Sequence, residues 1–362
     1  MLKAALARNL INILGCKIPK KIVIIESDDW GAIRMPSKKV YNDLVQKDII
    51  KADDPFTKYD SLASEEDLNL LFEVLSSVKG ANGKPAVLTA DCIMANPDFE
   101  KIKQSGYREY YYETAVETLK KYPKHSTCFN IWKQGINQEV FKPQLHGREH
   151  VNVLPWLKHL QESEKNYKYA FERSTYAINS NISAALNYSN LVEEKYLDEV
   201  INDACKLFEK AFGFKSETFI APNYTWGLGV ERSLNNNNIA YLQGSKTQNV
   251  PSLLGKTQTK YHYTGQKNKF KQTYLVRNCL FEPSVSPNLD YVSVCMKQIS
   301  NSFYWKKPAI ISSHRLNYVG YLDEKNRDKN LHSLKELLQR IVKIWPDVVF
   351  MSTDELAKYM SQ

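Results

Sequence analysis

Two adjacent carboxylates, Asp28 and Asp29, come directly after the apolar segment 21–27, which reads KIVIIES. A β-branched apolar run of this length predicts a buried strand, so both acids are expected at its carboxyl end. Neighbouring carboxylates repel each other, which costs stability unless a cation lies beside them. The pair therefore indicates either a metal site or a loop with two solvated acids, one of which could cap a helix.

The segment HGREH places His146 and His150 four residues apart. Two histidines at this spacing can bind one metal ion from a single helical turn, although a capping histidine beside a surface histidine gives the same spacing. His146 follows the predicted strand 141–145 as Asp29 follows 21–27, and the strand ends of an α/β barrel face the same mouth. Two imidazoles and one carboxylate, with room for water, are typical of catalytic zinc.

Two further polar segments follow predicted strands. His314 ends the apolar run 308–313, where it suits a general acid or base, or a structural histidine that bonds to loop backbone. The loop 221–227 reads APNYTWG, and its backbone N–H groups could point into the mouth. Its aromatic side chains, Tyr224 and Trp226, suit either stacking on a sugar face or packing within the loop.

The elements that position these residues alternate between strand-like and helix-like segments, which is typical of βα units. Strands are expected over 21–27, 85–90, 141–145, 217–221, 239–242, 273–277, 308–313 and 347–351. Helices are expected over 64–75, from 97, and over 113–120, 152–162, 192–212, 289–303 and 329–344. We therefore predict an α/β fold in which residues 1–362 form a single domain. Its core would be a distorted (β/α) barrel of about seven or eight strands, with loop insertions near 167–190 and 243–271.

Taken in order, these segments resemble the motifs of the polysaccharide deacetylase family (carbohydrate esterase family 4). The segment 27–31 resembles the family's Thr-Phe-Asp-Asp-Gly motif, which implies that Asp28 is the catalytic base and Asp29 a metal ligand. The segment 146–150 resembles the family's H-S/T-x-x-H motif, which implies that His146 and His150 are the other two ligands.

Two more motifs extend the resemblance toward the end of the chain. The segment 221–224 resembles the family's Arg-x-Pro-Tyr loop, which implies that the Tyr224 N–H stabilises an oxyanion. The segment 312–314 resembles its Leu-x-His motif, which implies that His314 is the general acid. The resemblance thus runs from the first predicted strand to His314, and it implies one divalent metal ion, with Zn²⁺ as the first expectation.

The chain also departs from the family pattern. Trp30 is inserted before the glycine, and Gly147 and Ser312 stand where the family has a Ser/Thr and a Leu. Ala221 stands where an arginine normally pairs with the catalytic Asp, and no Asp-x-Trp motif is evident.

Two residues late in the chain are candidates to compensate for these departures. Arg277, at the end of a predicted strand, is expected to replace the missing arginine, and Glu282 is a candidate partner for His314. For substrate contacts we expect Trp30, Trp226, Arg277 and Arg315.

The resemblance implies a metal-dependent hydrolase that removes N-acetyl groups from a sugar or glycan. Three alternatives stay open at this point. One is a different C–N hydrolase on the same barrel, acting on a cyclic amide. Another is a glycosidase that uses Asp28 and Glu149 as its acid pair. The third is a degenerate barrel that binds glycans without turnover, which the alanine at position 221 would explain.

Composition limits the kinds of partner and the compartment that we expect for this protein. The chain has 49 Lys+Arg against 40 Asp+Glu, but the basic residues are scattered, which favours a solvated basic face over a nucleic-acid site. Its 6 cysteines show no C-x-x-C spacing and fit free thiols in a reducing compartment. Residues 1–21 predict a short amphipathic helix, not an export signal, and no stretch approaches the ~18 apolar residues of a membrane span. We therefore expect a cytoplasmic protein without membrane insertion.

Overall fold

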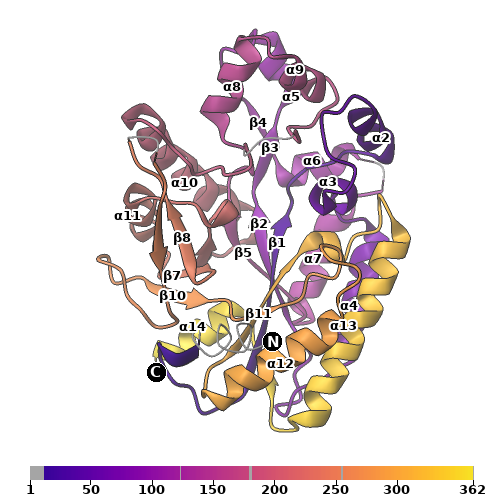
Figure 1. The fold of residues 1–362 in the computed structure, drawn as a ribbon, viewed down its shortest axis with the longest axis vertical. Helices are drawn as coiled ribbons and strands as arrows, with labels where there is room; N and C mark the ends of the chain where they lie inside the picture. Colours follow the sequence, from indigo (N-terminus) through magenta and orange to yellow (C-terminus); the bar gives the residue numbers. More distant parts are fainter. Residues whose placement is uncertain (1–11, 123, 179–181, 254–255, 362) are drawn as a thin grey trace.

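The computed structural model describes residues 12–122, 124–178, 182–253 and 256–361 (Figure 1). Its centre is a parallel sheet with helices packed outside it. The path across the sheet is β10-β7-β6-β5-β2-β1-β12-β11, and β13 pairs with β1. The strands are β1 (Ile22–Trp30), β2 (Leu88–Ile93), β5 (Phe141–Gly147), β6 (Thr218–Ile220), β7 (Tyr241–Gly244), β10 (Thr273–Val276), β11 (Cys279–Leu280), β12 (Ala309–His314) and β13 (Val349–Phe350).

The two ends of this sheet belong to one extended segment of the chain. β10 pairs with β7, and β11, which begins three residues after β10 ends, pairs with β12 at the other end of the path. The sheet therefore curls back on itself, and Arg277 lies at the point where the segment passes from one edge to the other. This arrangement confirms the predicted α/β fold, a distorted (β/α) barrel.

Helices cover the outside of the curled sheet (Figure 1). They are α2 (Lys38–Gln46), α3 (Pro55–Tyr59), α4 (Glu65–Ser76), α5 (Phe99–Gln104), α6 (Ala115–Lys121), α7 (Cys128–Asn137), α8 (Val153–Gln161), α9 (Lys165–Phe171), α10 (Leu191–Phe212), α11 (Leu228–Asn236), α12 (Tyr291–Tyr304), α13 (Glu324–Ile344) and α14 (Thr353–Ser361). The capping box expected at Ser64 and Asp67 is present, and α10 ends at Gly213, whose φ of 78° suits glycine.

The predicted strands and most predicted helices form where expected, because a buried parallel strand and an amphipathic helix leave clear periodic patterns. Pro97 was expected to open a helix, but it ends the short strand β3 (Ala95–Pro97), and Asp98 caps α5 instead. β3 pairs with β4 (Tyr112–Thr114). The insertion 243–271 contains the hairpin of β8 (Thr247–Val250) and β9 (Gln258–Tyr261).

Other expectations concern the N-terminal segment, the cysteines and membrane insertion. Most of the helix predicted over 1–21 falls on residues 1–11, which lie outside the described residues. The 6 cysteines are all unpaired thiols. Among the described residues, no helix combines the length and apolar character that a bilayer span requires.

Candidate metal centre and active site

A bulge at the end of β1 turns both carboxylates into the same cavity. The register between β1 and β2 shifts between Ser27 and Trp30, and Asp29 adopts a φ of 76°. Successive side chains of a regular strand alternate between faces, so Asp28 and Asp29 would otherwise point apart. With the bulge, both line one cavity. Left-handed backbone at a non-glycine residue stores strain and is typical of functional positions.

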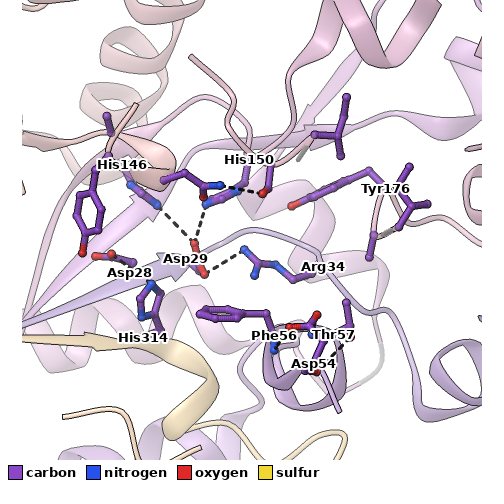
Figure 2. A pocket seen from close by; sticks show the side chains of 17 residues that line it. Asp28, Asp29, Arg34, Asp54, Phe56, Thr57, His146, His150, Tyr176 and His314 are labelled. Atoms are coloured by element: carbon purple, nitrogen blue, oxygen red, sulfur yellow. Dashed lines mark hydrogen bonds and ion pairs between the residues drawn. The ribbon is translucent and has the colours of Figure 1, made fainter. Parts of the chain in front are cut away.

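Asp29, His146 and His150 form a compact and almost fully buried group (Figure 2). Asp29 Oδ1 lies 3.4 Å from His146 Nε2 and 3.1 Å from His150 Nε2, and all three ligand atoms lie within 4.8 Å of one another. A tetrahedral ion with bonds of ~2.0–2.1 Å places its ligand atoms about 3.3 Å apart. The two separations are therefore close to the edge length of a zinc tetrahedron.

The histidines meet, but not as sequence spacing suggested. His146 belongs to strand β5, and the residues from Arg148 to His150 form an irregular loop, not a helical turn. The predicted helical i,i+4 geometry is therefore wrong, and a strand-to-loop reversal brings the rings together. His146 Nδ1 lies 2.9 Å from the Ile220 carbonyl oxygen. A carbonyl must receive a hydrogen bond, so this contact keeps the proton on Nδ1 and leaves Nε2 free to bind a metal.

The charges of this group suit a cation. Burial works to raise the pKa of Asp29, but Arg34 and His150 beside it hold that pKa well below its ordinary value. Burial lowers the pKa of His150, so its ring is neutral and offers a lone pair. Asp29 Oδ2 accepts a hydrogen bond from Arg34 at 3.2 Å, whereas the buried Oδ1 accepts none. An ionised oxygen facing two imidazole nitrogens without a hydrogen bond fits a bound divalent ion.

Arg277 holds Asp28 with two hydrogen bonds. Arg277 Nη1 lies 2.8 Å from Asp28 Oδ2 and Nη2 lies 2.5 Å from Oδ1, while Ala221 offers no polar group. The same guanidinium contacts Glu26 at 2.6 Å and Asp91 at 3.1 Å. The arginine expected within reach of Asp28 is therefore present. It is buried and does not line the cavity, so the substrate contact expected of Arg277 is not supported.

One guanidinium faces three buried carboxyl groups, and they do not share its charge equally. Burial works to raise the pKa of Asp28, yet Arg277 outweighs it and holds this pKa below its ordinary value. Burial raises the pKa of Glu26, and it raises that of Asp91 further because the Asp28 charge lies close by. Of the three carboxyl groups that face Arg277, Asp28 is thus the one kept ionised.

His314 lies between Asp28 and a second carboxylate. Its Nδ1 lies 2.6 Å from Glu282 Oε1, and its Nε2 lies 3.6 Å from Asp28 Oδ2. Burial works to lower the pKa of His314, but Glu282 and then Asp28 outweigh it and raise the pKa to about 9. The ring therefore carries a proton at neutral pH, and Glu282 occupies the partner position expected for it.

Tyr224 does not offer the backbone donor that its motif implies. It lies in a short 3₁₀ turn, Pro222–Tyr224, where its N–H donates to the Ala221 carbonyl at 3.0 Å. The hydroxyl of Tyr224 instead accepts a hydrogen bond from Arg277 at 3.2 Å. The expected role of this N–H is therefore corrected, because the tight turn already uses it.

Three of the residues expected to bind substrate are buried away from the cavity. Trp30 is 1% exposed and packs edge-on against Phe141, with ring centroids 5.2 Å apart. Trp226 is buried and donates to Glu231 at 3.1 Å. Arg315 is buried and pairs with Asp60 at 2.9 Å. None of the three lines the cavity, so the substrate contacts expected of them are not supported.

The cavity beside the three-residue group has a volume of about 400 Å³ (Figure 2). Short segments that the sequence did not single out supply much of its wall. They include Arg34, Asp54, Phe56, Thr57, Tyr176, Ile178, Ile182 and Ser183. Several of them come from the predicted insertion 167–190, whose loop-like composition was the one available signal. Glu149 does not line the cavity and is bound by Arg148 at 2.6 Å, which removes the acid pair that a glycosidase would need.

Comparison with known proteins adds similarities of fold. No family model and no curated protein sequence matches the chain. A putative polysaccharide deacetylase from Mycobacterium smegmatis is 8% identical with a TM-score of 0.47, over 96% of this chain and 92% of that one. A CE4 family pseudoenzyme from Bacillus anthracis is 10% identical with a TM-score of 0.39, over 93% and 65%. Puue allantoinase is 8% identical with a TM-score of 0.44, over 94% and 90%.

Two of these solved structures carry the name of the family that the motifs resemble. At such identities and TM-scores the likeness is one of fold alone.

Proposed function

We propose that the protein is a metal-dependent hydrolase that removes an N-acetyl group from a sugar or glycan. The observation that carries the proposal is the convergence of Asp29, His146 and His150 on one buried point, beside a carboxylate held by Arg277. Two imidazole nitrogens and one carboxylate oxygen suit Zn²⁺ and leave a position open. The six unpaired thiols favour a reducing compartment, so we place this activity in the cytoplasm.

The chain supplies a base and an acid in opposite protonation states at one pH. When bound, the divalent ion supplies Lewis acidity, which acidifies a coordinated water and polarises a carbonyl oxygen. Asp28, kept ionised and oriented by Arg277, accepts the proton of the attacking water. His314, kept protonated by Glu282, donates a proton to the departing amine. Such separation of two pKa values is the usual basis of acid and base roles.

The contact between Arg277 and Asp28 also bears on the non-catalytic alternative. That alternative arose from the alanine at position 221, which removes the family's usual partner of the base. The bidentate guanidinium of Arg277, between β10 and β11, supplies the same charge and orientation. We therefore favour a catalytic protein over a glycan-binding barrel without turnover.

The test is acetate release from a panel of N-acetylated sugars and oligosaccharides by zinc-loaded protein. We expect release by at least one member, its loss with a chelator, and its recovery with added zinc. Cyclic amides and an assay for new reducing ends complete the panel, since they detect a cyclic-amide hydrolase and a glycosidase. Hydrolysis of a cyclic amide without acetate release, or activity indifferent to chelator, would overturn the proposal.

A further inference from the structure

The Tyr176 hydroxyl is a buried donor in the cavity wall with no hydrogen-bond partner. Tyr176 lines the cavity, is 3% exposed, and its Oη is unpartnered. Figure 2 shows the side chain reaching toward Asp29 with the hydroxyl end foremost. A buried hydroxyl without a partner destabilises a free protein and gains most from a ligand that accepts its hydrogen bond.

Three other side-chain donors of the same wall have partners within the protein. Arg34 donates to Asp29 at 3.2 Å and lies 3.4 Å from Asp60. Thr57 donates to the Asp54 carbonyl at 3.2 Å. The Asn223 amide donates to Ser183 at 3.1 Å. Among these four side chains, Tyr176 is the one whose donor has no hydrogen-bond partner.

A neighbouring residue fixes the place of Tyr176. The Thr175 hydroxyl donates to the Arg34 carbonyl at 2.5 Å and accepts from the Ala177 N–H at 3.0 Å. These bonds tie the segment around Tyr176 to the chain just beyond the two catalytic carboxylates. Burial raises the pKa of Tyr176, so the hydroxyl keeps its proton, and the smaller influences of Arg34 and Asp29 on this pKa agree with their proximity. The donor is therefore positioned before any ligand arrives.

The proposed reaction needs such a donor. Attack on an acyl carbon places negative charge on the carbonyl oxygen, and donors aimed at that oxygen commonly contribute a large part of catalysis. The Tyr224 N–H, which the motif resemblance assigns to this task, donates to Ala221 instead. We propose that the Tyr176 hydroxyl donates a hydrogen bond to the substrate's acyl oxygen and stabilises its developing charge. This inference rests on the proposed deacetylase function.

The experiment compares zinc-loaded wild type with Y176F and with the control Y274F. Tyr274 is also buried, but its hydroxyl donates to Glu231 at 2.8 Å and does not line the cavity. Steady-state kinetics on an N-acetylated sugar, calorimetric titration with acetate, zinc content and thermal midpoint are measured for each protein. Acetate serves as the probe because its oxygens can occupy the place of the acyl oxygen without turnover.

For Y176F we expect kcat to fall about 100-fold with KM changed little, because the lost interaction is strongest in the transition state. Acetate should bind about 10-fold more weakly, while zinc content stays at the wild-type value and the thermal midpoint does not fall, because the free protein loses no hydrogen bond. Y274F should show the reverse, with a lower midpoint and unchanged acetate affinity.

A Y176F protein with wild-type acetate affinity and a lowered midpoint would overturn the inference, since the hydroxyl would then be structural. A loss confined to KM would overturn it too, because it would place the hydroxyl on another part of the substrate. If wild type releases no acetate from any glycan but binds acetate in a Tyr176-dependent way, the proposed deacetylase function fails while the oxygen-binding role stands.

Discussion

The contact between Glu282 and His314 predicts the pH at which activity falls on the alkaline side of the pH–activity profile, which we call the alkaline limb. Glu282 is the largest of the influences that raise the pKa of His314 from its ordinary 6.5 to about 9, against the opposing effect of burial. The rise corresponds to about 3 kcal/mol in favour of the protonated ring. The His314 side chain is 23% exposed, so screening by solvent is modest.

The perturbation is Glu282→Gln, which removes the charge and retains an oxygen that can accept from Asn317, now 2.7 Å from Glu282 Oε2. The general acid works when protonated, so activity is lost as pH rises through the pKa of His314. We expect the alkaline limb of kcat/KM to move down by at least about one pH unit in the variant. A bound divalent cation lowers the limb of both proteins, so the comparison between them is the measured quantity.

The assay is kcat/KM for acetate release between pH 6 and pH 10, a range of about four pH units that contains the pKa of His314. Glu231→Gln is the matched control, because Glu231 is equally buried and lies outside the cavity. In metal-free protein, NMR titration of the 7 histidines reports His314 directly. An unchanged limb in the Glu282 variant, or a His314 that titrates near 6.5 in wild type, would refute the reasoning.

The same shift affects stability. A histidine whose pKa is raised by folding stabilises the folded state fully below its unfolded value of 6.5, and that contribution is lost as pH rises through about 9. Denaturant midpoints of metal-free wild type should therefore fall between neutral pH and pH about 10 by more than those of the Glu282 variant.

Three further predictions concern the metal and the base. Chelation should abolish turnover and lower the thermal midpoint of wild type, and added zinc should restore both. The Asp29→Ala variant should stay inactive when zinc is added, and activity retained in that variant would contradict the ligand assignment. Asp28→Asn should lose more than about 100-fold in kcat yet keep its zinc after dialysis, and loss of the ion would reverse the order of the pair. Arg277→Ala should lower kcat far more than zinc affinity. It should also destabilise the fold by about 3–5 kcal/mol, because three buried carboxyl groups lose their cation. A variant with unchanged kcat would show that Arg277 does not position the base.

The sequence by itself determined the fold and most of the reacting groups. Buried parallel strands show as apolar runs, and residues at their carboxyl ends share one mouth, so strand-end position alone groups Asp28, Asp29, His146 and His314. The same reasoning made Arg277, at the end of a predicted strand, the candidate partner of the base.

The tertiary structure decided the side-chain directions and the cavity wall. The β-bulge after Ser27 turns the Asp29 side chain into the cavity and leaves Trp30 in the core. No local sequence pattern shows which of these two side chains will face the cavity. Likewise, the Tyr224 N–H is lost to a turn bond, while Tyr176 reaches the cavity from an insertion of loop-like composition. Periodicity records burial along an element, whereas the path of an irregular loop depends on contacts with segments distant in sequence.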